Sequence, residues 1–394
     1  MSKKKFAVYL CIWAILLFLL ASLAGSDMPN VIGKQNDIVV KAKITAITHR
    51  EKASLEDENA LFHQGVNIEF SAKILSGSNR GKIVSGLQNI DESNPYNIQE
   101  VKKGDKVLLS FFSDENMGSY WLMTEFIRTD FLMLLALIFA VCVIFFGRFK
   151  GVTTIASLVL TCLCIFKVLI PSILSGKNIY VWSVIVCLYI ILMTETLISE
   201  NRKKCITASL GCIAGSFTVG ILTFISDLFL NLTGVLNEES MYLKYVIEGQ
   251  EIDLKAIIFA SILIGAVGAI MDVSISISSS LYELSQKAAD NSFKSLMSSG
   301  MAIGRDIMGT MANTLVLAYI GSSMALTILL FAYSDNYIAL FNREILVVEV
   351  LNAIVGSFAL LLTIPLTSFI SSASFSGGLR GVALYLIGEE KEKE

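Results

Sequence analysis

Six residues suited to chemistry inside a membrane lie three or four positions apart in a predicted membrane helix and its inner extension. At 3.6 residues per turn, this spacing places them on one face of the helix. The glycines would let a neighbouring helix approach closely, and the carboxylates and hydroxyls would form a polar stripe. The six are Gly265, Gly268, Asp272, Ser276, Ser279 and Glu283, and Ser274 widens the stripe.

Asp272 is the most informative member of this stripe because it lies deep within its span, residues 255–280. A carboxylate at that depth must pair, take up a proton or meet water, since charge is costly in hydrocarbon. The stripe therefore has two interpretations, the wall of a hydrated pathway or a polar seam between packed helices. The sequence leaves both open.

The next predicted span, residues 312–333, is preceded by a connection that is not a plain loop. Residues 281–311 carry spaced apolar side chains and are predicted to form an amphipathic helix at the cytoplasmic interface. Arg305 in this segment either pairs with a carboxylate such as Asp272 or extends to lipid headgroups. The polar residues that continue the predicted pathway are Asp306, Thr310, Asn313 and Thr314.

Further polar and small residues lie in the other spans. The last span, residues 345–370, carries a polar face, and Pro365 is predicted to break its helix near the inner end. Lys167 could counter one of the intramembrane carboxylates. The secondary site candidates are Glu195, Asp227, Glu349, Asn352 and Lys167, and the candidates for close helix packing are Gly211, Gly215, Gly265, Gly268 and Gly356.

Composition places these residues in a multi-pass membrane protein. The chain has 394 residues, of which 54% are hydrophobic and only 16% charged, with a mean hydropathy of +0.67. The net charge of −3 offers no basic surface for nucleic acid. Two histidines lie outside the spans and the seven cysteines lie in or beside them, so no metal site, cofactor or disulfide framework is expected. No nucleophile has a base at catalytic spacing within the spans, which argues against an enzyme.

Eight apolar runs are long enough to cross a bilayer as helices. The first has two interpretations, a retained anchor over residues 1–24 or a cleaved signal peptide, and both would export the segment after it. The runs are residues 6–24, 130–147, 151–174, 179–198, 205–230, 255–280, 312–333 and 345–370. Residues 130–370 are thus a seven-helix bundle, followed by a tail at 371–394.

Lysine and arginine fix the predicted orientation, because they gather in cytoplasmic loops. With the N-terminus inside, the short inner segments hold fourteen basic residues and the short outer loops hold four. The chain is therefore predicted to lie in the bacterial cell membrane with both termini in the cytoplasm and residues 25–129 outside.

Residues 25–129 show alternating polar and apolar residues separated by turn signals, which is typical of short strands. A small all-β barrel, OB-like in type, would close these strands on themselves. The predicted strands are residues 38–44, 66–75, 82–84, 106–112 and 120–123.

Two sequence blocks resemble the YibE/F-like family of bacterial multi-pass membrane proteins. They are GAIMDVSIS at residues 268–276, followed by SLYEL at 280–284, and GMAIGRDIMGTMANTL at 300–315. With its exported domain, the chain is similar to the longer, YibE-type members. The existence of shorter members implies a YibF-like membrane partner, and a homo-oligomer is the alternative. The resemblance implies an architecture but no substrate.

Two functions remain open from the sequence. One is a secondary transporter or ion-conducting protein in the bilayer that uses a carboxylate-lined pathway on the sixth to eighth spans, with Asp272 as the titrating or cation-binding group. The other is a non-transporting envelope assembly factor whose exported domain recruits a partner. The transported ion or solute is not specified by the sequence.

Overall fold

The computed structural model describes residues 3–25, 38–52, 65–90, 99–114, 118–199, 201–245, 251–287, 290–333 and 336–376. The chain divides into two compact units. One unit comprises Gly33–Cys142, and the other comprises Met1–Ile32 together with Val143–Glu394.

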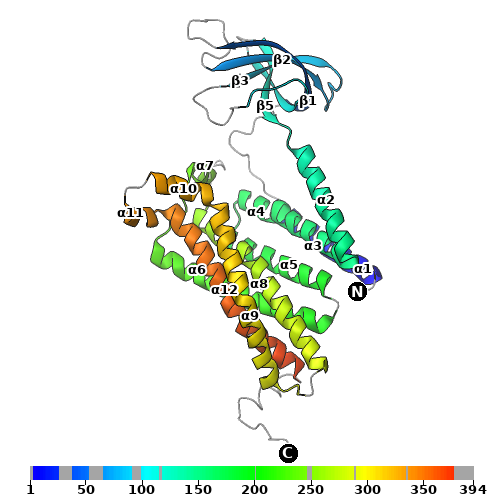
Figure 1. Ribbon diagram of the computed structural model, residues 1–394, viewed down its shortest axis with the longest axis vertical. Coiled ribbons are helices and arrows are strands. Elements are labelled where there is room, and N and C mark those ends of the chain that lie inside the picture. Colours follow the sequence, from blue (N-terminus) through cyan, green and yellow to red (C-terminus); the bar gives the residue numbers. More distant parts are fainter. Residues whose placement is uncertain are drawn as a thin grey trace, which may run out of the picture. The chain divides into compact units, whose positions relative to one another are not determined.

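The smaller unit is a closed five-stranded barrel with strand order β1-β2-β3-β5-β4, as Figure 1 shows in blue and cyan. All neighbouring strands are antiparallel except β3 and β5, which run parallel. The strands are β1 (Ile38–Lys52), β2 (Val66–Ile74), β3 (Ile83–Ile90), β4 (Lys106–Asp114) and β5 (Gly118–Phe126). The small OB-like barrel predicted from the alternating pattern is confirmed.

The alternation of buried and exposed residues along these strands gives the barrel an apolar interior and a polar outer surface. Along β2 every second residue is buried, with Ile68 and Phe70 filling the interior and Glu69 facing outward. Gly86 on β3 lies directly beneath the Phe70 ring, where a β-carbon would stand 2.7 Å from the ring atoms. The barrel core therefore depends on one large side chain packed against one glycine.

The larger unit is helical. Among the described residues of the chain, seven helices are long and apolar enough to span a membrane, or eight if α9 and α10 form one bent span. The angle at the break between α9 and α10 is 62°. The helices are α1 (Lys3–Ala24), α2 (Thr129–Gly147), α3 (Phe149–Cys164), the π-helix η1 (Ile165–Leu169), α4 (Ile170–Leu174), α5 (Ile179–Ile198), α6 (Arg202–Leu230), α7 (Glu238–Lys244), α8 (Leu254–Lys287), α9 (Phe293–Ser322), α10 (Met324–Ala332), α11 (Tyr337–Phe341) and α12 (Glu344–Phe375).

Helix α12 is the centre of the helical unit, since it packs against α6, α8 and α9 (Figure 1). Helix α5 packs on α8 and α6 at the other side of this group. Buried aliphatic residues of α5, α6, α8 and α12 form one continuous core, which includes Ile191, Val219, Ile270 and Val355. These four helices therefore contribute most of the buried interior of the helical unit.

The structure differs from prediction in two places near the end of the chain. Residues 293–311 do not form a separate interfacial helix but are the first two-thirds of α9. Gly300 and Gly304 bring α9 against Ser368 and Ile364 of α12, which explains why this segment joins the bundle. The predicted break at Pro365 is also wrong, because α12 continues through it to Phe375. A membrane helix tolerates one missing backbone hydrogen bond where neighbouring helices cover it.

Candidate functional site

The structure divides the predicted polar stripe of α8 between two faces. Ser274 is fully buried, and Ser278, one turn further along, is fully buried beside it. Asp272 and Glu283 are exposed, while Ser276 and Ser279 are half-buried. The stripe is therefore a mainly buried hydroxyl face next to an exposed carboxylate face.

The predicted pathway residues of α9 all lie on the exposed side of that helix. Arg305, Asp306, Thr310, Asn313 and Thr314 are exposed, and the arginine donates a hydrogen bond to the carbonyl oxygen of Met301 at 3.3 Å. The two threonine hydroxyls donate to carbonyl oxygens of their own helix. Among the described residues, Arg305 forms no salt bridge with Asp272, Asp306 or Glu283.

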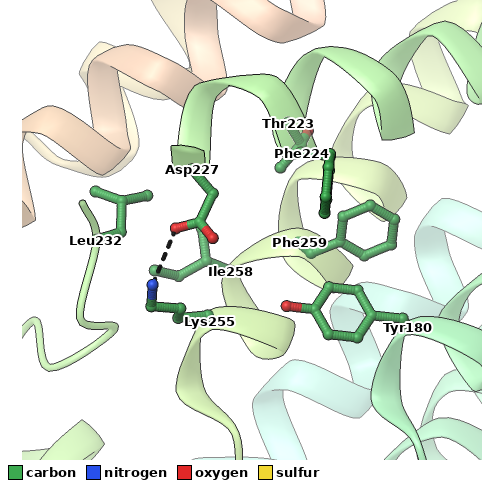
Figure 2. A pocket seen from close by; sticks show the side chains of 8 residues that line it. All are labelled: Tyr180, Thr223, Phe224, Asp227, Leu232, Lys255, Ile258 and Phe259. Carbon is green, nitrogen blue, oxygen red and sulfur yellow. Dashed lines mark ion pairs between the residues drawn. The ribbon is translucent and has the colours of Figure 1, made fainter. Parts of the chain in front are cut away.

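The secondary candidates are dispersed. Glu349 and Asn352 are half-buried on α12, and Lys167 is exposed on η1. Asp227 forms an ion pair with Lys255 at 3.5 Å, beside a cavity of about 20 Å³ (Figure 2). This pair lies at the opposite end of α6 from Arg202, and the hydroxyl of Tyr180 faces the same cavity.

Four of the five predicted packing glycines have a close neighbour. Gly211 and Gly215 of α6 lie against Thr367 and Thr363 of α12. Gly265 lies against the hydroxyl of Tyr319, and Gly356 lies against Leu315. Gly268 has nothing within 4 Å of an added β-carbon and faces outward.

The buried centre of the helical unit contains a chain of polar side chains from four helices. The Glu195 carboxyl of α5 accepts a hydrogen bond from the Cys212 thiol of α6 at 3.7 Å. That thiol also interacts with the Ser274 hydroxyl of α8, and Ser274 bonds to Thr367 of α12 at 3.1 Å. All four side chains are 0% exposed. We call these four residues the buried polar chain.

Glu195 is the only acidic residue of the buried polar chain, and its hydrogen-bond partners are neutral. Its second carboxyl oxygen accepts a hydrogen bond from Ser199 at 3.4 Å, at the end of α5. Within the described part of the chain, no lysine or arginine forms a salt bridge with it. A buried carboxyl without a counter-charge can exchange a proton or bind a cation, which makes it the strongest functional candidate in the bundle.

A second polar layer lies one helical turn away from the buried polar chain. Thr207 of α6 and Ser278 of α8 share a hydrogen bond of 2.5 Å, and both are buried. Ser278 also donates to the carbonyl oxygen of Lys204 at 3.2 Å. Hydroxyls therefore continue from Ser274 toward the end of the bundle.

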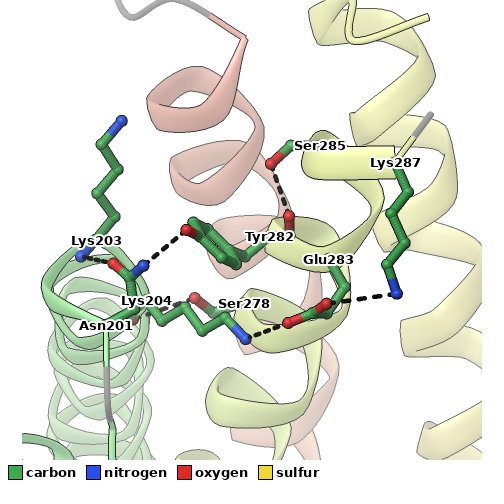
Figure 3. A network of polar contacts seen from close by, with 8 residues as sticks. All are labelled: Asn201, Lys203, Lys204, Ser278, Tyr282, Glu283, Ser285 and Lys287. Carbon is green, nitrogen blue, oxygen red and sulfur yellow. Dashed lines mark hydrogen bonds and ion pairs between the residues drawn. The ribbon is translucent and has the colours of Figure 1, made fainter. Parts of the chain in front are cut away.

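The third layer lies at the inner end, meaning the end of the bundle at residues 201–204 and 281–287, which the charge distribution predicts to be cytoplasmic. Figure 3 shows Asn201 donating to the Tyr282 hydroxyl at 2.7 Å and Lys204 pairing with Glu283 at 2.8 Å. Lys287 adds a longer ion pair to Glu283 at 3.8 Å. Polar contacts thus join this inner end to the Thr207–Ser278 layer, and Ser278 lies one helical turn from Ser274 of the buried polar chain.

Helix α12 adds three serines whose hydroxyls have no hydrogen-bond partner among the residues that the structure describes. Ser368, Ser371 and Ser372 are each 0% exposed. Buried hydroxyls are usually paired, because an unpaired one loses its hydration without compensation. These three oxygens are therefore available to water or a cation beside Thr367.

Toward the opposite end, apolar side chains close the interior. Val219 is fully buried and lies between Cys212 and Thr223 along α6, and Ile262 of α8 is buried in the same apolar core. Thr223 precedes Asp227 by one turn of α6. Polar groups reach inward from both ends, but this apolar layer separates them.

Thr207, Cys212 and Ser371 were absent from the candidates drawn from sequence, whereas Gly211 and Gly215 were among them. Thr207, Gly211 and Gly215 are spaced four apart on α6, as are Thr363, Thr367 and Ser371 on α12. This matched spacing is the signal that identifies the two facing stripes. Cys212 carries no such signal, because cysteine within a span is usually a small apolar residue. Among the described residues, no group of three histidine, cysteine, aspartate or glutamate side chains could hold a metal ion.

The fold and the buried polar residues define a multi-span helical membrane protein with an added β-barrel domain. The YibE/F-like protein family matches residues 135–377, and the YibE/F family N-terminal domain matches residues 39–122. The chain therefore belongs to the YibE/F family. No curated protein and no solved structure matches it.

Proposed function

We propose that this protein is a secondary transporter that moves a proton or a small cation along the polar layers between α5, α6, α8 and α12. The observation that carries the proposal is Glu195, a fully buried carboxyl linked through Cys212 and Ser274 to Thr367. Intramembrane carboxyls of this kind mark proton relays and ion pathways in membrane proteins.

The arrangement supports access from one side at a time. Hydroxyls at Thr207 and Ser278 continue from the buried polar chain toward the Lys204–Glu283 pair at the inner end. Val219 and Ile262 close the other side. In a second conformation, the apolar layer at Val219 would open and connect Glu195 to Thr223 and Asp227. The Glu195 carboxyl would then be reached from one end of the bundle in one conformation and from the opposite end in the other.

The test is solid-supported-membrane electrophysiology on full-length protein in liposomes, with separate proton, sodium and potassium jumps. Glu195→Gln keeps the side-chain size but removes the titrating group, so the wild-type current should be lost. Asp272→Asn is measured in parallel, because it removes the exposed carboxylate of α8. Loss of current in Asp272→Asn alone would move the pathway to the exposed face. A current that is unchanged in Glu195→Gln would overturn the proposal for the buried polar chain.

A further inference from the structure

Charged and polar side chains of the neighbouring helices α8 and α9 are exposed on the helical unit. We use the name α8–α9 face for six exposed residues of these two helices, Gly268, Asp272, Arg305, Asp306, Gly309 and Asn313. All six residues are exposed. In a single chain they would contact lipid.

Helix geometry gives the depth of these groups. Asp272 lies eleven residues beyond Glu283 of the inner-end ion pair, or about 16 Å at 1.5 Å per residue. Gly300 of α9 packs at the level of Leu281, so Asp306 lies about 9 Å deeper than that level. Because the hydrocarbon layer is about 30 Å thick, both aspartates lie within it.

Within the described part of the chain, no residue of opposite charge pairs with these groups. Asp272 and Asp306 form no hydrogen bond or salt bridge among the described residues, and Arg305 bonds only to its own helix. A lysine or arginine can extend its long stem to the headgroups, but an aspartate side chain is too short. Exposure of two carboxylates to lipid is therefore strongly unfavourable, and a covering surface that carries a cation would relieve it.

Small residues on the same face leave room for a close neighbour. A β-carbon added at Gly268 or Gly309 would meet nothing within 4 Å. Glycines that pack inside the chain, such as Gly211 and Gly304, are in tight contact with another helix. Gly268 and Gly309 thus resemble packing glycines whose partner is missing, since close helix approach in membranes uses small residues.

We propose that a second copy of this chain covers the α8–α9 face in the membrane and forms a twofold dimer. A twofold interface presents the same surface from both copies, so it must be complementary to itself. The α8–α9 face meets this condition, because it carries a cation and two anions. Arg305 of one copy would then lie opposite Asp272 or Asp306 of the other, with Asn313 completing the hydrogen bonds. The proposal does not depend on the transport proposed above.

The test is the stoichiometry of full-length protein at high dilution in liposomes, measured by single-molecule photobleaching with one fluorophore per chain. Gly268→Trp is accommodated by the chain itself, since nothing lies within 4 Å of the added β-carbon, but it would block a second copy. We expect two bleaching steps for wild type and one for Gly268→Trp, with a dissociation constant raised at least about tenfold.

Leu158→Trp is the matched control, because Leu158 is 47% exposed on α3, away from the face. It should keep two bleaching steps. Arg305→Glu should also give one step, because the face then carries only negative charge. If the wild-type protein bleaches in one step, the proposal is overturned. The α8–α9 face would then be covered by lipid or by a different membrane protein. Two steps retained in both Gly268→Trp and Arg305→Glu would overturn it as well.

Discussion

Gly211 of α6 and Thr367 of α12 are packed so closely that a β-carbon at position 211 would overlap the threonine hydroxyl. The same threonine bonds to Ser274 of α8 at 3.1 Å. The missing side chain at Gly211 therefore sets the position of the last member of the buried polar chain. Helix packing and the proposed site depend on the same contact.

We expect Gly211→Val to destabilise the protein by about 1–3 kcal/mol, because overpacking a tight helix contact forces neighbouring side chains to move. Thermal unfolding in detergent should show a lower midpoint. Thr367→Ala in the same chain should recover part of the loss, since it removes the atoms that the valine overlaps.

Gly220→Val is the control for this experiment. An added β-carbon at Gly220 meets only the Phe259 ring, at an ordinary distance of 3.7 Å. Its unfolding midpoint should stay close to that of wild type. An equal loss in both variants would show that glycine flexibility, and not the Thr367 contact, sets the stability of α6.

The Cys212 thiol is predicted to couple Glu195 to Ser274. Cys212→Ala removes the link between the carboxyl and the hydroxyls, so the transient current in supported membranes should fall severalfold. Cys187→Ala is the matched control, since Cys187 is also a buried thiol of the core. Among the described residues, no polar contact links Cys187 to the buried polar chain. Equal currents in the two variants would rule out a role for the thiol.

Sequence alone predicts the barrel and most spans because each has a strong periodic signal. Buried and exposed residues alternate along strands such as β2, and spans such as α2 are apolar along almost their whole length. It cannot assign the face that each polar residue of α8 occupies, because Asp272 and Ser274 are separated by about 200° around one helix. Which side faces α12 depends on contacts such as Ser274 with Thr367, and these join residues 93 positions apart. Glu195 was identifiable as an intramembrane carboxyl, but its burial depends on three other helices.

In the barrel, Gln88 is predicted to fix the segment that precedes β4. It is 0% exposed, donates to the carbonyl oxygen of Gln99 at 2.9 Å and accepts from the amide of Val101 at 2.9 Å. Gln88→Leu would remove the partner of the buried Val101 amide, at about 1–3 kcal/mol, and that of the partly buried Gln99 carbonyl at a smaller cost. Hydrogen exchange of the full chain should then show faster exchange at Val101. Gln99→Ala should leave that rate unchanged, because the carbonyl it contributes belongs to the backbone. A slow Val101 amide in Gln88→Leu would contradict the assigned role.

The ion pair between Arg50 and Glu100 predicts a pH dependence in the barrel. The guanidinium donates to both carboxyl oxygens, at 2.7 and 3.3 Å, and holds the pKa of Glu100 below its usual range. Because the folded pKa lies below the unfolded one, the stabilisation is present above the unfolded pKa and is lost as pH falls through the folded value. Both side chains are largely exposed, so the effect should be small and weakened by salt.

The measurement is the thermal midpoint of the barrel in the full chain. It is monitored by hydrogen exchange of the β1 and β2 amides, at a series of pH values from neutral to pH 3. Glu100→Gln should lower this midpoint at neutral pH, and the difference from wild type should shrink as pH falls through the folded pKa of Glu100. Glu69→Gln is the control, since Glu69 is also exposed and, among the described residues, forms no ion pair. A difference between Glu100→Gln and wild type that does not shrink as pH falls would show that the glutamine acts through packing and not through the lost charge.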